Sequence, residues 1–168
     1  MTTLVLTVIG DDRSGLVTQL SDIIATHGGN WTTSSMARLA GKFAGIVEVD
    51  IAEDRADGLQ EALEPLAGLL EITAHRGAVG TESGTHVRLD FVGDDRAGIV
   101  HDITAIVHRC GGSIESLSSE ISEAPMSGGE LFTAHAVIRV PDSEAARTLR
   151  AELEGIADEL MVDLTFGA

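Results

Sequence analysis

The stretch Gly10-Asp11-Asp12-Arg13-Ser14-Gly15 recurs later in the chain as Gly93-Asp94-Asp95-Arg96-Ala97-Gly98. Each copy follows a strand-like run, at 4–9 or 87–92, and precedes a helical stripe of apolar residues that ends at a Gly-Gly pair. Self-similarity at a constant spacing is the sequence signature of a duplicated structural unit. The chain of 168 residues is therefore predicted to contain two copies of one small domain, each with a turn that leads into a helix.

Hydrophobic periodicity predicts the same order of elements in both halves. In the first half we expect strands at 4–9, 30–39, 43–52 and 70–75, a helix at 16–27, and a second helix that opens at Asp54 and is ended or kinked by Pro65. In the second half we expect strands at 86–92, 113–122, 131–140 and 159–166, with helices at 98–110 and 142–156. The continuous apolar run at 4–9 indicates a central strand that is buried on both faces.

This order of elements defines the fold class. Strand-helix-strand-strand-helix-strand is the split βαβ, or ferredoxin-like, arrangement. We therefore expect an α+β protein with two ferredoxin-like βαββαβ domains in tandem, each an antiparallel four-stranded sheet with both helices on one face. The expected domains are 1–78 and 86–168, and the small and polar residues at 79–85 are typical of a flexible linker. The second hairpin carries an insertion at 123–129.

The charge of the chain excludes several classes of partner. The formal net charge is −16, and both halves are acidic. Affinity for nucleic acid comes largely from Lys and Arg that displace counterions from phosphates, so we expect no direct binding to DNA or RNA. Aromatic residues make up only 3% of the chain, which leaves too few for a base-stacking platform on a sheet. The same acidity argues against binding to an anionic membrane.

Cysteine, histidine and N-terminal features point to a protein without a cofactor. Cys110 is the single cysteine, so no intrachain disulfide can form, and a reducing compartment is expected. The six histidines show no spacing that would bring several metal ligands together, so we expect neither a metal nor another cofactor. The N-terminus runs directly into a strand and no apolar run is long enough to span a membrane, which predicts a cytoplasmic location.

The duplicated turn is the strongest candidate for a binding site. Free N–H groups in the first turn of a helix attract an anion by about 0.3 to 1 kcal/mol at an exposed site, so a carboxylate would find donors there. The nearby aspartates, Asp11 and Asp12 with Asp94 and Asp95, could hold an ammonium group. A purely structural interpretation has one aspartate capping the helix, the other facing water, and Arg13 or Arg96 pairing with it. Retention of the turn in both copies favours a ligand site.

The half-chain pattern resembles that of the ACT domain. The resemblance rests on Gly-Asp-Asp-Arg-x-Gly followed by Leu-Val or Ile-Val after the first strand, and on Gly-Gly-Asn or Gly-Gly-Ser before the second. Two such domains without a catalytic domain resemble the glycine cleavage system transcriptional repressor family. The segment Ala124-Pro125-Met126-Ser127-Gly128 before Leu131-Phe132 is also similar to the second-domain hairpin of those proteins.

The resemblance implies regulatory binding of a small amino acid at the strand-helix turn, often where two ACT domains share an interface. The backbone of the turn would hold the ligand carboxylate, through Arg13, Ser14, Gly15 and Leu16 in the first half and through Arg96, Ala97, Gly98 and Ile99 in the second. Asn30 would be a candidate at the facing strand, with Ser113 as its counterpart. Because these two residues differ, one half could bind the ligand while the other has a structural role.

Three functional hypotheses follow. The leading one is a non-enzymatic regulator that binds a small amino acid, forms a homodimer, and acts through protein contacts, with a basic transcription regulator as a possible partner. The second is an enzyme on a ferredoxin-like fold, similar to acylphosphatases, which use an arginine in the loop after the first strand; here two aspartates beside Arg13 and Arg96 would repel a phosphoryl group. The third is a protein-interaction module that binds no ligand.

Overall fold

The computed structural model describes residues 1–77, 83–123 and 129–167. The chain divides into two compact units, Met1–Gly80 and Thr81–Ala168. Residues 79–82 of the expected linker lie outside the described ranges, as do residues 124–128 of the hairpin that carries part of the family resemblance.

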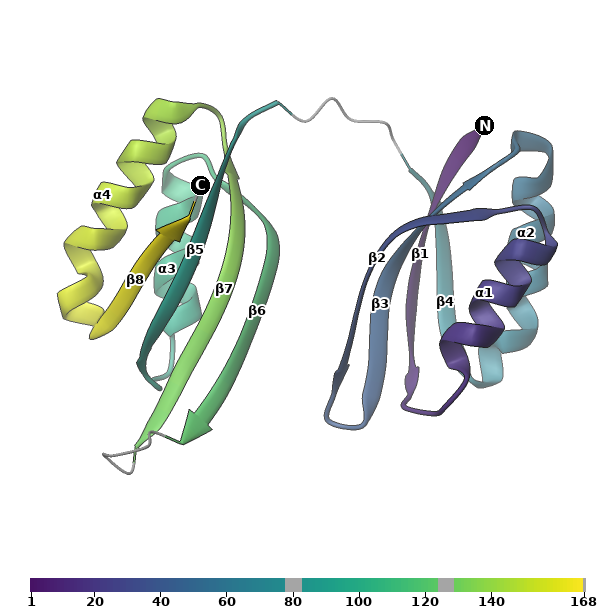
Figure 1. Cartoon of the computed structure of the whole chain (residues 1–168), viewed down its shortest axis with the longest axis horizontal. Coiled ribbons are helices and arrows are strands. Elements are labelled where there is room, and N and C mark those ends of the chain that lie inside the picture. Colours follow the sequence, from purple (N-terminus) through teal and green to yellow (C-terminus); the bar gives the residue numbers. More distant parts are fainter. Residues whose placement is uncertain (78–82, 124–128, 168) are drawn as a thin grey trace. The chain divides into compact units, whose positions relative to one another are not determined.

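The two units contain the same elements in the same order (Figure 1). The first consists of β1 (Thr2–Asp11), α1 (Leu16–Thr26), β2 (Asn30–Leu39), β3 (Lys42–Ile51), the 3₁₀ turn η1 (Glu53–Arg55), α2 (Ala56–Leu63), the 3₁₀ turn η2 (Glu64–Gly68) and β4 (Leu70–Arg76). The second consists of β5 (Thr85–Asp94), α3 (Ile99–Arg109), β6 (Ser113–Glu123), β7 (Glu130–Val140), α4 (Ser143–Leu160) and β8 (Val162–Gly167).

Each unit has one antiparallel four-stranded sheet. The strand order is β2-β3-β1-β4 in the first unit and β6-β7-β5-β8 in the second, so the first strand of each unit is central and the second and fourth lie at the edges. The two helices of each unit cover one face of its sheet (Figure 1). The predicted fold class, two ferredoxin-like βαββαβ units in tandem, is confirmed.

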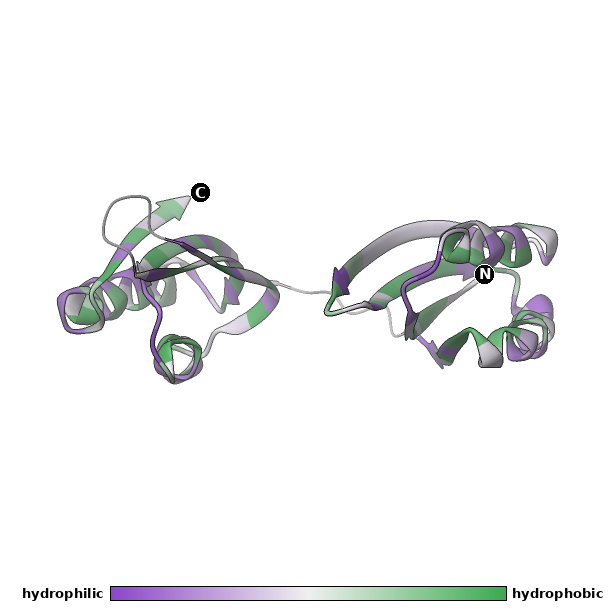
Figure 2. Cartoon of the chain, turned by 90° about the horizontal axis from the view of Figure 1, so that it is seen from below, coloured by the Kyte–Doolittle hydropathy of each residue, from purple (hydrophilic) through white to green (hydrophobic). Residues whose placement is uncertain are grey.

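The core of each unit is aliphatic and lies between its sheet and its helices. In β1, Leu4, Leu6 and Val8 are buried against the helices, whereas Ile9 on the other face of the strand is 47% exposed. Figure 2 shows hydrophobic and hydrophilic residues alternating along the helices and strands of both units. The expectation that this strand is buried on both faces is wrong, because within the unit helices cover only one face of the sheet.

Two helix boundaries also differ from the prediction. Asp54, expected to open the second helix, lies in the 3₁₀ turn η1, and α2 begins at Ala56. The prediction that Pro65 ends this helix is confirmed, since α2 ends at Leu63 and Pro65 lies in the first turn of η2. Helix α4 continues to Leu160, into the segment expected to be the last strand, because residues 157–160 are mostly good helix formers and Val162 is the first residue that pairs with β5. The left-handed caps predicted after the first helix of each unit are confirmed, with φ of 75° at Gly28 and 71° at Gly111.

Candidate functional site

A glycine in the left-handed conformation introduces the first helix of each unit. Gly15 has φ 86° and is the N-cap of α1, and Gly98 has φ 90° and is the N-cap of α3. A Cβ at Gly98 would have no heavy atom within 4 Å, and one at Gly15 would approach only the Nε2 of Gln19, at 3.9 Å. Nearby protein atoms would leave room for a side chain at both positions, so it is the left-handed backbone conformation that favours glycine there. Both glycines immediately precede the first helical turn.

The N-termini of α1 and α3 have no side-chain cap. In contrast, Asp142 caps α4, and its Oδ1 accepts hydrogen bonds from the backbone N–H of Glu144 at 2.9 Å and of Ala145 at 2.8 Å. The first N–H groups of a helix have no partner within the helix itself. Except for the N–H of Ile99, which donates to the carbonyl of Arg96 at 3.5 Å, the two turns therefore leave backbone donors, and the positive end of the helix dipole, open to an external anion.

In the first turn, the aspartates are paired with cations from the β2–β3 hairpin. Asp11 accepts a hydrogen bond from the Nζ of Lys42 at 2.5 Å, and Asp12 accepts one from the Nη1 of Arg38 at 3.0 Å. The hydrogen bond and the charge of Lys42 hold the pKa of Asp11 below its usual range. The structural interpretation of these residues is thus wrong in part, because neither carboxylate caps α1 and neither pairs with Arg13.

The second turn has the same backbone path but different electrostatics. The backbone N–H of Asp95 donates to the carbonyl of Glu130 at 2.9 Å, just as that of Asp12 donates to Gly41 at 3.0 Å. None of the described residues forms an ion pair with Asp94 or Asp95. Strand register explains the difference, because Leu131 pairs with Asp94 where Lys42 pairs with Asp11.

The arginine of the second turn also has a partner that the first turn lacks. Arg96 donates from Nη2 to the Oδ2 of Asp102 at 2.8 Å. Asp102 occupies the position of Gln19 in the first unit, since the N–H of each bonds to the carbonyl of the N-cap glycine, Gly98 or Gly15. The second turn therefore contains its own carboxylate at the start of α3, whereas the first turn has a neutral amide at that position.

Asn30 and Ser113 lie far from the turns of their own units. Asn30 begins β2 and pairs with Asp50, at the end of the sheet opposite to the β1–α1 turn. Helix α1 separates the two places by 11 residues, which is about 16 Å along its axis. Ser113 stands in the same relation to the turn of the second unit, where it pairs with Arg139. A single ligand could contact both a turn and this strand position only if the turn and the strand belonged to different domains.

The structure identifies four residues near the turns that were not predicted from the sequence: Gln19, Arg38, Lys42 and Asp102. Alignment of the two repeats could have identified Gln19 and Asp102 as counterparts, because they follow the turn glycines at the same spacing. The hairpin cations had no such signal, since strand pairing alone brings them to the turn. In the described part of the chain, no group of three or more His, Cys, Asp or Glu residues could hold a metal ion. No described helix is long and apolar enough to cross a membrane.

Comparison with known proteins identifies the family of the first unit. Residues 2–76 match the family model of the ACT domain, and the second unit repeats the same elements and strand order. The first unit thus matches the ACT domain, and the second unit has the same fold. No curated protein matches it significantly.

Among solved structures, this chain is similar to an unknown protein from Galdieria sulphuraria, with a TM-score of 0.88 and 28% sequence identity over 98% of this chain and 96% of that one. It is also similar in fold to a candidate glycine cleavage system transcriptional repressor, with a TM-score of 0.68 and 21% identity over 99% of this chain and 96% of that one. Both similarities extend over the two ACT units.

Proposed function

We propose that this protein is a non-enzymatic regulator that binds a small amino acid at an ACT strand-helix turn and acts through contacts with other proteins. One observation carries the proposal: each repeat leads through a left-handed glycine into a helix N-terminus that no side chain caps. A ligand carboxylate could accept hydrogen bonds from those N–H groups and would gain from the helix dipole. The ACT family match of the first unit supports the same role.

The first turn is the better carboxylate site on electrostatic grounds. Its two aspartates are paired with Arg38 and Lys42, and Arg13 adds a further positive charge beside the N-terminus of α1. In the second turn Arg96 is paired with Asp102. None of the described hairpin residues there is a cation that offsets the charges of Asp94 and Asp95. An anion would be attracted to the first turn and repelled by the second. Asp94 and Asp95 are better suited to an ammonium group.

The position of Asn30 favours an assembly of more than one domain at the ligand. Because this residue cannot reach the turn of its own unit, a role in binding would require that another ACT domain present it. We therefore propose a homodimer in which the turn and the strand position of different domains meet. The structures that resemble this chain include a candidate transcriptional repressor, so we place the regulator in the control of amino acid metabolism. The acidic surface fits a basic transcription regulator best as a partner. We place this interaction in the cytoplasm and propose no direct contact of the chain with DNA or membrane.

A thermal-shift screen of the full chain against the twenty amino acids tests the binding proposal. An amino acid at about a hundredfold excess over its dissociation constant stabilises the folded protein by about 2.7 kcal/mol, which raises the melting temperature by about 5 to 10 °C for a chain of this size. Gln19→Asp introduces the carboxylate of the second turn into the first and should abolish the shift. Gln19→Asn, which keeps a neutral amide, should retain it.

The reciprocal change provides the matched control. Asp102→Gln removes the internal carboxylate of the second turn and should leave binding at the first turn intact. Its titration by calorimetry should show at least one site per chain. If no amino acid at millimolar concentration moves the melting temperature, or if Gln19→Asp leaves the shift unchanged, amino acid binding at the first turn is contradicted.

A further inference from the structure

A groove of about 570 Å³ lies between α2 and the edge strand β4 in the first unit. Its floor is apolar and its rim polar, with the lining residues Gln60, Leu63, Glu64, Leu70, Ile72, Thr73 and Ala74. It lies beside the free edge of β4, which has no strand partner on that side in the described sheet. One end of the groove adjoins the β1–α1 turn, because Leu70 pairs with Gly10, but its lining includes none of the candidate ligand-binding residues of that turn.

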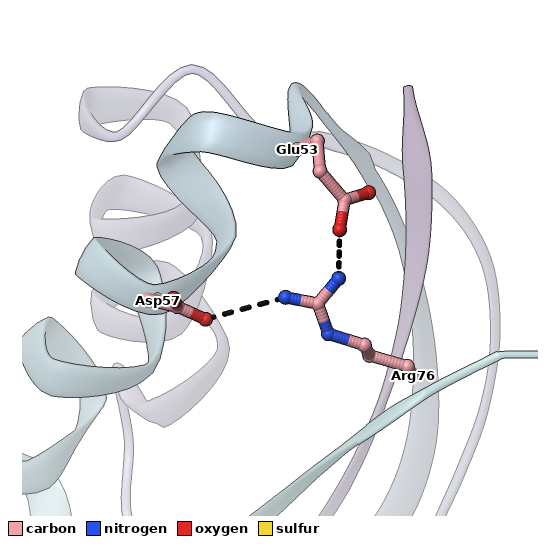
Figure 3. Close-up of polar contacts among 3 residues, drawn as sticks. All are labelled: Glu53, Asp57 and Arg76. Carbon is pink, nitrogen blue, oxygen red and sulfur yellow. Dashed lines mark hydrogen bonds and ion pairs between the residues drawn. The ribbon is translucent and has the colours of Figure 1, made fainter.

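Ion pairs hold one end of this groove together. Arg76, at the end of β4, donates hydrogen bonds to Glu53 and to the Oδ1 of Asp57 near the start of α2 (Figure 3). These contacts tie the helix to the strand at that end. Farther along both elements, between Gln60 and Leu70, the space between helix and strand remains open.

The second unit has side chains in the equivalent space. The guanidinium of Arg150, on α4, lies 5.5 Å from the centroid of the Phe166 ring on β8. Arg150 also donates from Nη2 to the carbonyl of Gly167 at 3.3 Å. A cation over an aromatic ring gains about 0.5 to 1 kcal/mol at an exposed site. An arginine and a ring thus add to the apolar contact between helix and strand in this repeat.

Register and burial show which residues of the first unit replace this pair. Leu6 in β1 and Leu89 in β5 are counterparts in the two repeats. Ala74 pairs with Leu6, and Phe166 pairs with Leu89, so Ala74 is the counterpart of Phe166. Gln60 follows the buried Leu59 as Arg150 follows the buried Leu149. The first unit therefore has neither the aromatic ring nor the guanidinium that the second unit has at this place.

We propose that the α2–β4 groove binds an extended segment of a partner protein that supplies an arginine and an aromatic side chain. The second repeat shows that this combination of side chains fits between such a helix and strand. The segment adds as a strand to the free edge of β4 and places its ring over Ala74 and Ile72. Its arginine meets Glu64 at the rim, and the net charge of −16 favours a basic partner. The inference is independent of amino acid binding at the turn.

Titration of the full chain with N-acetyl-arginyl-alanyl-phenylalanine amide, in which the arginine and the ring lie on the same face of an extended strand, followed by backbone amide NMR, tests the proposal. The peptide should shift the amide signals of residues 60–64 and 70–74 and leave those of α4 and β8 unchanged. N-acetyl-glutamyl-alanyl-phenylalanine amide, with the opposite charge, should bind at least tenfold more weakly because Glu64 repels it.

Two sets of variants provide the controls. The double variant Gln60→Arg with Ala74→Phe reproduces the contact of the second repeat and should reduce peptide affinity at least tenfold. Glu64→Lys changes only an exposed rim residue, so it should fold normally and should reverse the preference between the two peptides. The converse double variant, Arg150→Gln with Phe166→Ala, should create a second set of shifts in α4 and β8.

The proposal is overturned if the arginyl peptide causes no localised shifts at millimolar concentration. It is also overturned if both peptides bind equally, or if Glu64→Lys leaves their preference unchanged.

Discussion

At the scale of single residues, the ion pairs of the hairpin determine the charge of the first turn. Lys42 pairs with Asp11 across β1 and β3, and the pKa of Asp11 is lowered mainly by that hydrogen bond. Arg38 pairs with Asp12 in the same way. The turn motif is duplicated, but these cations are not, since Ile121 and Leu131 occupy their positions in the second unit. The two turns therefore share their backbone geometry but differ in charge.

Replacement of Lys42 by Met should raise the pKa of Asp11 toward its ordinary value. A carboxylate whose pKa is lower in the folded than in the unfolded state stabilises the fold above its unfolded-state pKa, and this contribution is lost as the pH falls through the folded-state pKa. The variant should thus lose part of the acid-range dependence of stability. A carboxyl ¹³C NMR titration measures the pKa, with Lys42→Arg as the charge-retaining control. An unchanged pKa in the Met variant would show that the ion pair does not form in solution.

At the scale of elements, the helices differ in how their N-termini are satisfied. Helix α4 has a side-chain cap from Asp142, whereas α1 and α3 begin at left-handed glycines that offer no side chain. A capped helix is stabilised internally and has fewer free donors. Helix α2 also lacks a side-chain cap, but it begins after the 3₁₀ turn η1, so only α1 and α3 combine an uncapped N-terminus with a left-handed N-cap glycine.

Asp142→Ala should destabilise the second unit by about 1 kcal/mol, because the N–H groups of Glu144 and Ala145 lose their acceptor. Urea denaturation followed by circular dichroism measures the change. Trp31, the single tryptophan, lies in the first unit and reports on that unit separately by fluorescence. Ser14→Ala, in an exposed turn position, is the matched control and should change stability by less than about 0.5 kcal/mol. Equal stability of Asp142→Ala and wild type would argue that the cap contributes nothing.

At the scale of the whole molecule, the net charge of −16 limits how the protein can act on gene expression. The eleven Lys and Arg residues are dispersed, and several described ones are paired with carboxylates, among them Arg38, Lys42, Arg76, Arg96 and Arg109. Binding to a phosphate backbone needs cations that are free to replace its counterions. Any effect on transcription should therefore pass through a protein partner.

A mobility-shift assay at low salt tests this expectation with the purified chain and duplex DNA. We expect no saturable retardation, with or without amino acids, because the surface repels a polyanion. A known basic DNA-binding protein serves as the positive control for the assay. Sequence-specific retardation by the chain alone would contradict the expectation and favour a direct repressor.

The main features of the fold could be predicted from the sequence because they depend on neighbours along the chain. The alternation of apolar residues in helices and strands, the Gly-Gly caps and the repeated turn together predicted the order of elements and the α+β class. Boundaries were less certain where local signals compete. Helix α4 extends into the expected last strand because pairing with β5 begins only at Val162.

The electrostatics of the turns and the open groove depend on residues that are distant in sequence. Strand register brings Lys42 to Asp11, and the same register brings Leu131 to Asp94. The separation of Asn30 from the turn also follows from the direction of β2 along the sheet. By itself the sequence determined two similar ferredoxin-like folds with paired turns, because repeats and periodicity are local. Tertiary structure alone decided that the two units differ in charge at the turn and in packing beside the edge strand, because pairing across a sheet places side chains that no local pattern relates.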